Sequence, residues 1–238
     1  DFPKYLNSPE TEFFKKNQSL YNLNLAKSAI LKQKQVIICE GYMDVIGLAN
    51  FGINNVVAAL GTALGLEHAK ILAKLAPSLV ICLDGDLAGL NAAKRFIEII
   101  LPYLGTKVDF RFIFLEKSYD PDDYVKEFGK NNFLKLIENA QNISDVIFDN
   151  CLKDLNIRQD QLISPEAKSK LEENLQKKCQ IIKNRQISNN FNQYYKNKIF
   201  ALTRQKFTQN NQVKLAKVQK KEEKIDDIIG KNILKILL

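Results

Sequence analysis

Short apolar runs rich in β-branched residues alternate with longer amphipathic segments along the first half of the chain. The runs are too short for buried helices and predict buried strands. They lie at residues 36–39, 55–59, 79–83 and 107–115, and the helical segments between them at 42–50, 66–75 and 88–101. Because such alternation through short loops gives parallel pairing with right-handed crossovers, we predict an α/β fold with a four-stranded, mainly parallel sheet flanked by helices.

Flanking segments add helices to this picture. A short helix at 25–33, capped by Asn24, leads into the first strand, and another opens at Asp120 and runs to about residue 128. No convincing strand follows Gly129, and we expect helices there at 131–139, 143–155, 165–183 and 191–207. The last carries an aromatic stripe, which we interpret as packing core rather than as a base-stacking platform: Phe191, Tyr194, Tyr195, Phe200 and Phe207.

Charge and composition indicate which partners and which cellular compartment the protein suits. The net charge is +8, and residues 131–238 hold 20 of the 35 basic but only 12 of the 27 acidic side chains. This distribution suits a protein that holds metal in one region and a polyanion in another, although a lysine-rich solubilising surface is an open alternative. There is neither an apolar stretch of about 18 residues nor a signal-peptide pattern. The four cysteines form no C-x-x-C pair, so we expect buried, reduced thiols in a cytoplasmic protein.

Carboxylates lie in or just beyond the loops that follow three of the predicted strands. They are Glu40 and Asp44, Asp84 and Asp86 with Gly85 between them, and Asp120 and Asp122. Ligands of open α/β sheets bind beyond the carboxyl ends of the strands, where these acids fall. Carboxylates that repel one another need a cation, and Mg²⁺, which takes oxygen ligands, is the natural candidate. Local roles stay open, because Glu40 also suits a helix N-terminus and Asp120 an N-cap.

Other chemistry receives less support. Gly61 and Thr62 follow the second strand, where they could help hold phosphate or the loop of Glu40. There is no P-loop or dinucleotide motif and no cluster of cysteine and histidine. The only histidine, His68, lies in a predicted amphipathic helix and is expected at the surface. Metal-directed phosphoryl transfer is therefore the reaction class that these acids suit best.

Several of these motifs together resemble one family. The stretches EGYMD at 40–44, GTAL at 61–64, DGD-x-AG at 84–89 and DPD at 120–122 look like the Toprim domain of bacterial DnaG-type DNA primases. The stretch KYLNSPET at 4–11 looks like the end of the N-terminal subdomain of that family. The resemblance covers roughly residues 1–150. The zinc ribbon of the family has no counterpart here, so we expect a fragment of the catalytic core without zinc.

The resemblance implies a DNA-dependent RNA polymerase that makes short primers on single-stranded DNA by nucleotidyl transfer. It implies catalytic roles for Glu40, Asp44, Asp84 and Asp86. It implies Mg²⁺, or Mn²⁺ in its place, on Glu40, Asp84, Asp86, Asp120 and Asp122. It also implies nucleotide-phosphate contacts for Lys4, Asn7 and Lys16.

The same resemblance suggests a domain plan and partners. Residues 1–31 would end the N-terminal subdomain, 32–130 form the Toprim domain, 131–207 a helical subdomain, and 208–238 the linker toward a helicase-binding region. Partners would be single-stranded DNA, nucleoside triphosphates, the RNA primer and the replicative helicase, at the replication fork in the nucleoid and with no membrane. Two alternatives stay open: a Toprim-type nuclease or topoisomerase, and a non-catalytic module that binds helicase or DNA.

Overall fold

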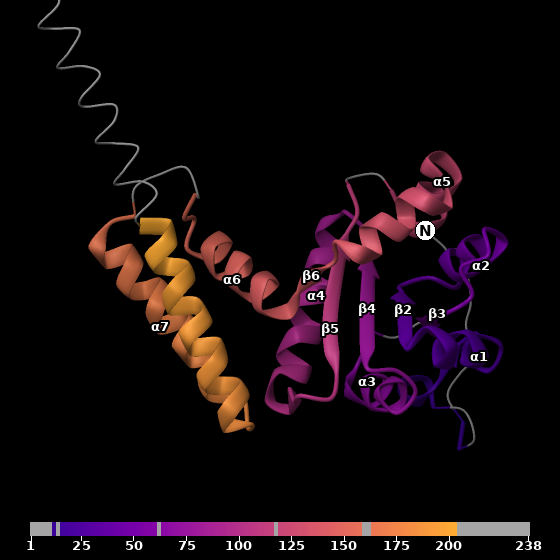
Figure 1. Ribbon diagram of the computed structural model, residues 1–238, viewed down its shortest axis with the longest axis horizontal. Helices are drawn as coiled ribbons and strands as arrows, with labels where there is room; N and C mark the ends of the chain where they lie inside the picture. Colours follow the sequence, from indigo (N-terminus) through magenta and orange to yellow (C-terminus); the bar gives the residue numbers. More distant parts are fainter. Residues whose placement is uncertain (1–10, 13–14, 61–62, 117–118, 159–162, 204–238) are drawn as a thin grey trace, which may run out of the picture.

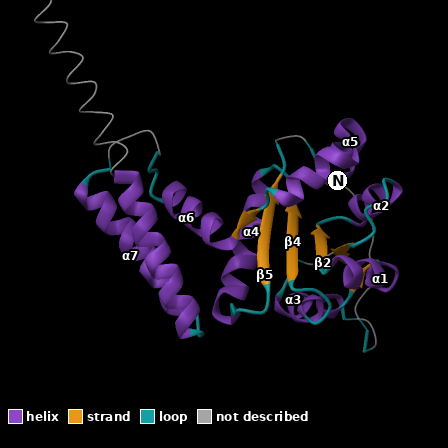
Figure 2. Cartoon of the chain, viewed as in Figure 1, coloured by secondary structure: helices purple, strands orange, loops and turns teal. Residues whose placement is uncertain are grey.

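A six-stranded mixed sheet forms the centre of the fold (Figures 1 and 2). The computed structural model describes residues 11–12, 15–60, 63–116, 119–158 and 163–203. The strand order is β1-β3-β2-β4-β5-β6, and the four central strands run parallel. The strands are β1 (Leu20–Tyr21), β2 (Gln35–Cys39), β3 (Val56–Ala59), β4 (Ser78–Leu83), β5 (Asp109–Phe114) and β6 (Gln141–Asn142).

The four predicted strands are the four parallel strands, with ends shifted by no more than two residues. The prediction missed both edge strands, and the expectation of no strand after Gly129 was wrong. β1 pairs antiparallel with β3, and β6 pairs antiparallel with β5 through Arg111 and Asn142. Each edge strand has only two residues, which is too short to show the alternation by which a strand is recognised in a sequence.

The helices fall close to their predicted positions. They are α1 (Leu23–Gln33), α2 (Tyr42–Asn50), α3 (Leu66–Ala73), α4 (Leu87–Ile100), α5 (Pro121–Glu138), α6 (Ile143–Asp154) and α7 (Pro165–Ile181), with 3-10 turns η1 (Lys16–Gln18) and η2 (Leu101–Tyr103). A further helix covers residues 185–203. α5 is broken at Gly129, whose φ of 79° separates the two helices predicted there.

The expected cap of α1 was wrong. Asn22 rather than Asn24 precedes the helix, in a left-handed conformation with φ of 66°. Its side chain does not cap the helix and instead donates a hydrogen bond to the carbonyl of Val56 at 2.9 Å. A contact with β3, distant in sequence, therefore fixes where α1 begins.

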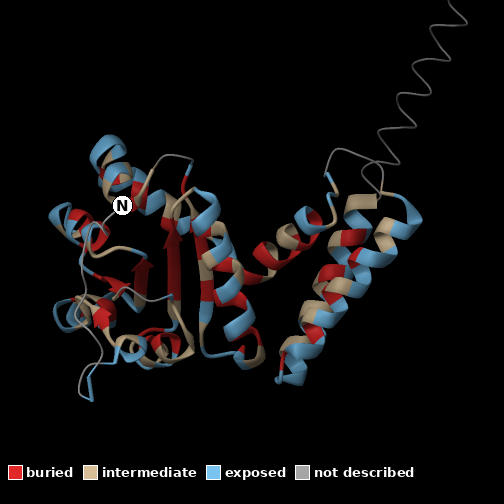
Figure 3. Ribbon diagram, turned by 180° about the vertical axis from the view of Figure 1, so that it is seen from behind, coloured by how far each residue is buried: buried red, intermediate tan, exposed pale blue. Residues whose placement is uncertain are grey.

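Alternate residues of the central strands enter two apolar layers. Figure 3 shows these strands as buried. Ile38 and Ile81 face the layer that includes residues of α3, α4 and α6. Ile37 and Val80 face the layer formed with α2 and α5. Because both faces of the parallel sheet are covered, its strands appear in the sequence as continuous apolar runs. All four cysteines are buried and free.

Most of the aromatic stripe is packing core, as predicted. α7 and helix 185–203 lie side by side (Figure 1), and Tyr195 stacks on Phe148 of α6 with ring centroids 6.2 Å apart. Phe191 meets Tyr195 edge-on, and the hydroxyl of Tyr194 donates a hydrogen bond to Asp145. Phe200 is exposed, so it does not belong to this core. Phe207 and the segment 208–238 lie outside the described residues.

Within the described part of the chain, none of the helices combines the length and hydropathy needed to cross a lipid bilayer.

Candidate active site

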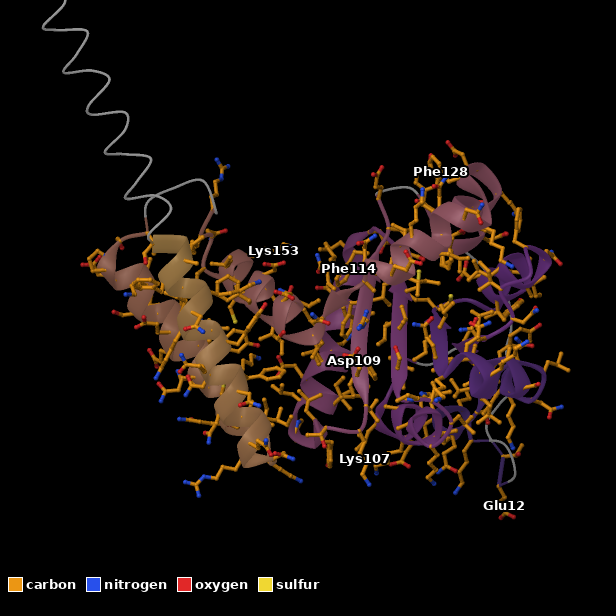
Figure 4. All side chains as sticks on the ribbon, viewed as in Figure 1. Glu12, Lys107, Asp109, Phe114, Phe128 and Lys153 are labelled. Atoms are coloured by element: carbon orange, nitrogen blue, oxygen red, sulfur yellow. The ribbon has the colours of Figure 1, made fainter. Side chains whose placement is uncertain are left out.

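Carboxylates gather where the parallel strands β2, β4 and β5 end. Glu40 directly follows β2, Asp84 directly follows β4, and Asp120 lies just before α5, beyond the end of β5. Phe114 marks this carboxyl end of β5 in Figure 4, whereas Lys107 lies beyond the opposite end. The charge of Glu40 raises the pKa of Asp84, and the backbone of Asp84 lowers the pKa of Glu40. The first two acidic loops of the sequence therefore lie close together.

Three carboxylates of this edge, one of them Asp120, lie at the starts of helices. Asp86 caps α4 by accepting the N–H of Gly89 at 2.7 Å, and Asp120 caps α5 by accepting the N–H of Asp123 at 2.7 Å. Asp44, in the first turn of α2, accepts the N–H of Gly41 at 2.9 Å. The capping role considered for Asp120 is confirmed. Such a bond occupies one carboxylate oxygen and leaves the other available for a ligand.

Burial and repulsion by neighbouring carboxylates raise the pKa values of Glu40, Asp44 and Asp84. Burial is the main cause that raises the pKa of Asp84 to about 6, followed by the charges of Glu40, Asp120 and Asp86. Burial likewise raises the pKa of Asp44 to about 7, against the hydrogen bond from Gly41. The pKa of Glu40 is raised by burial too. Each carboxylate therefore gains stability from a cation placed among them.

Two carboxylate oxygens of this edge have no hydrogen-bond partner within the described residues. They are Oδ1 of Asp84 and Oδ1 of Asp122, and both are buried. A buried, unpartnered oxygen is costly unless a ligand satisfies it, and a divalent cation would do so. The donor set consists of carboxylate oxygens, which suits Mg²⁺ or Mn²⁺. Among the residues described, however, no three or more His, Cys, Asp or Glu side chains already converge as a metal site.

Asp122 faces a different neighbour from the other acids. One of its oxygens accepts a hydrogen bond from Lys126 at 2.6 Å, and its side chain lies against Gly47 of α2. A Cβ at Gly47 would be only 2.0 Å from Oδ1 of Asp122, so the glycine allows α2 and α5 to pack closely. The charge of Asp122 acts on Asp44. Asp44 and Asp122 thus lie on the α2–α5 side of the site.

A cavity beside Glu40 was not foreseen from the sequence. It has a volume of about 480 Å³ and is lined by the ends of β2, β3 and β4 and one face of α4. Arg95 lines it and lowers the pKa of Glu40 against the effect of burial. Arg95 lies well down α4 from Asp86, and nothing in the local sequence connects it with the acidic loops.

Of the residues expected to contact nucleotide phosphates, only Lys16 is described. It opens η1, and its side chain is partly buried. Lys4 and Asn7, as well as Gly61 and Thr62, lie outside the described residues.

The expectation of a surface His68 was wrong. The side chain is fully buried, and its Nδ1 accepts the N–H of Gly65 at 3.2 Å. Since that nitrogen must be an acceptor, Nε2 carries the proton and donates to the carbonyl of Lys16 at 3.0 Å. A neutral histidine therefore ties η1 to the start of α3. The amphipathic pattern of α3 could not reveal this contact, because its partner lies 52 residues away.

Removing this tie should loosen η1. His68→Leu leaves the Gly65 N–H and the Lys16 carbonyl without their partner, at a cost of about 2 kcal/mol. We expect Tm to fall by about 4–8 °C and the amides of residues 15–19 to exchange faster with solvent. His68→Asn keeps an acceptor near Nδ1 but does not reach Lys16. It should preserve most of the stability and still show the faster exchange. Unchanged exchange in both variants would contradict the contact.

The fold and the acidic strand ends define a Toprim-like domain. Residues 37–125 match the Toprim-like family model, and residues 1–27 match the model for the N-terminal domain of the DNA primase catalytic core. The chain belongs to the DnaG-type DNA primase family.

Similar proteins support this assignment. The chain is 48% identical to the DNA primase of Legionella pneumophila over 155 aligned residues. The aligned region covers 65% of this chain and 27% of that protein. A solved DnaG catalytic core aligns with a TM-score of 0.75 at 35% identity, over 84% of this chain and 63% of that one. A DnaG catalytic domain bound to single-stranded DNA aligns with a TM-score of 0.73 at 34% identity, over 83% and 62%. The chain thus spans about a quarter of the curated relative and about three fifths of the solved cores.

Proposed function

We propose that this chain is the part of a primase catalytic core that carries the catalytic acids and joins ribonucleotides on a single-stranded DNA template. The observation that carries the proposal is the position of Glu40, Asp84, Asp86 and Asp120 at one edge of the sheet, where the charges of the other three raise the pKa of Asp84. Membership in the primase family and the similarity to a DnaG domain bound to single-stranded DNA support the template and the reaction.

In the proposed reaction, the 3′-hydroxyl oxygen of the primer forms a bond to the α-phosphorus of a nucleoside triphosphate, and the bond to pyrophosphate breaks. Asp84, Asp86 and Asp120 would hold Mg²⁺, or Mn²⁺ in its place, with Asp122 at the border of the site. Bound metal would activate the attacking hydroxyl and stabilise the leaving pyrophosphate. Glu40 would be the key acidic group beside the metal ions, and Asp44 would support the acidic loops from α2.

The nucleotide and the wider partners follow from the same proposal. Lys16, together with Lys4 and Asn7, would contact the triphosphate, and the tie from His68 would position Lys16 through its backbone. The protein would act at the replication fork in the cytoplasm, and residues 208–238 would lead toward a part that binds the replicative helicase. The proposed domain limits are 1–31, 32–130, 131–207 and 208–238.

Primer synthesis tests this proposal. The chain can replace the matching segment of the Legionella pneumophila primase, to which it is 48% identical. We expect the chimera to make primers with Mg²⁺. Its Glu40→Gln form should make them at least about 100-fold more slowly, because removing one preorganised electrostatic group typically lowers kcat by that factor. Asp154→Asn, which removes an exposed charge of α6, should leave the rate unchanged.

Equal rates for the chimera and its Glu40→Gln form would contradict the proposal. If the chimera does not fold, calorimetry on this chain decides, because nucleoside triphosphate binding should require both a divalent cation and Glu40. Labelled DNA incubated with Mg²⁺ but without triphosphates tests the alternative, since strand cleavage would indicate a nuclease or topoisomerase.

A further inference from the structure

A second cavity lies toward the amino end of β5, away from the acidic edge at the carboxyl ends of the strands. It has a volume of about 380 Å³, within the range of small-molecule pockets, and is lined by α3, the end of α4 with η2, the start of β5 and the turn after α7. Its wall is mostly apolar and is formed by Ala69, Ala73, Ile100, Val108 and Phe110. Lys107, at its rim, lies at the amino end of β5, whereas Phe114 marks the acidic end (Figure 4). The cavity is therefore separate from the carboxylates.

An exposed tyrosine and two lysines are held at the mouth of this cavity. Tyr103 is 53% exposed, and its ring centroid lies 4.6 Å from Nζ of Lys183 and 6.0 Å from Nζ of Lys70. The backbone N–H of Lys183 donates to the carbonyl of Pro102 at 3.3 Å, which fixes the turn after α7 against η2. The ring attracts both ammonium groups. The helical subdomain thus contributes one of the cations of this site.

The positive charge at this mouth is largely uncompensated. Nζ of Lys70 forms an ion pair with Oε1 of Glu67 at 2.7 Å. Within the described ranges, Lys107 and Lys183 have no ion-pair partner. Exposed lysines without acidic partners attract anions, and attract most strongly a chain of phosphates. An apolar hollow, an aromatic edge and free ammonium groups together match a nucleotide, because its base is flat and apolar-faced and its phosphate is anionic.

We propose that this cavity is a second nucleic-acid contact, which receives one nucleotide of a single DNA strand. The base would enter the apolar hollow beside Tyr103, and the flanking phosphates would bind Lys70, Lys107 and Lys183. The contact would not depend on the DNA sequence, because the hollow is apolar and the lysines at its rim would bind phosphates rather than base edges. The inference goes beyond the proposed function, because a strand would bind here whether or not the acidic edge is catalytic.

Binding of a fluorescent single-stranded DNA oligomer to this chain, measured by anisotropy, tests the proposal. We expect Tyr103→Ala to weaken binding by about five- to tenfold, as loss of one base contact does, and Tyr103→Phe to restore it. The double variant Lys107→Glu/Lys183→Glu should weaken binding by more than tenfold and reduce the salt dependence. Lys135→Glu reverses one exposed charge of α5 on the other side of the sheet, so it is charge-matched to Lys107→Glu or Lys183→Glu alone, and it should cause a much smaller loss than either.

A cross-linking measurement adds a readout of position. Iodouracil in the oligomer should cross-link to the peptide that contains Tyr103. The proposal would be overturned if Tyr103→Ala and the double-lysine variant both bound the oligomer as tightly as Lys135→Glu does. Cross-links confined to other peptides would also overturn it. Equal competition by polyglutamate, with Tyr103→Ala unchanged, would indicate an acidic protein partner instead. Divalent-dependent nucleotide binding that requires Glu40 should survive all these substitutions, so failure here is distinguishable from failure of the polymerase proposal.

Discussion

Asp84→Asn should reduce the affinity of the chain for Mn²⁺ or Mg²⁺ by at least about 100-fold. Removing a group that only orients a metal ligand typically lowers metal affinity 10–100-fold. Removing a carboxylate that binds the metal directly should lower the affinity by at least as much. Asp84 has a buried oxygen without a partner in the described residues, and its pKa responds to the charges of three other acids. Calorimetry or Mn²⁺ paramagnetic resonance measures the effect.

The same substitution should stabilise the metal-free protein at pH 8. The pKa of Asp84 in the fold is about 6, against an ordinary value of 3.8, so the folded state binds this proton more tightly than the unfolded state. The ionised form is therefore penalised, with no penalty below about pH 4 and the full penalty above about pH 6. The shift corresponds to about 3 kcal/mol, and solvent screening of this partly exposed side chain reduces the expected gain to about 1 kcal/mol.

In EDTA, this gain should raise Tm by about 2–4 °C at pH 8 and by almost nothing at pH 4. Asp154→Asn, which removes the exposed partner of Lys94, is the matched control and should leave cation binding unchanged. A variant that keeps full metal affinity would exclude Asp84 as a ligand. A loss of stability at pH 8 would show that the fold does not penalise the ionised carboxylate of Asp84.

Gly85→Ala should destabilise the protein by about 3 kcal/mol and weaken cation binding with it. A Cβ at this position would lie 2.1 Å from the carbonyl oxygen of Leu115 and 2.4 Å from that of Glu116. Both obstacles are backbone atoms, which cannot rotate away as a flexible side chain can. The loop between β4 and α4 must then move from the loop after β5, at a cost near the upper end of typical overpacking. Thermal unfolding and calorimetry measure the two effects.

Gly105→Ala provides the control, because a Cβ there would meet no atom within 4 Å. It should leave stability unchanged or raise it slightly through the unfolded state. If Gly85→Ala were as stable as Gly105→Ala, the close approach of the two loops would be refuted. If Gly85→Ala lost stability but kept its metal affinity, Asp84 and Asp120 would not need this spacing.

The candidate site was largely predictable because each of its acids is next to a strong local signal. The buried runs that became β2 and β4 end directly at Glu40 and Asp84, and parallel strands bring their carboxyl ends to one edge. Asp120 was recognisable as a cap because Pro121 follows it. Arg95 and Gly47 carried no such signal. Their importance depends on Glu40 and Asp122, which approach them only once the helices pack.

The sequence by itself determined the parallel strands, the helices between them and the placement of carboxylates at the strand ends, because each of these follows from neighbours a few residues away. Only the tertiary structure decided that two-residue strands form both edges of the sheet, that His68 is buried and bonded to the carbonyl of Lys16, and that Asp122 faces Gly47. These features depend on contacts between segments distant along the chain. A local pattern of apolar and polar residues does not encode such contacts, since many partners would satisfy the same pattern.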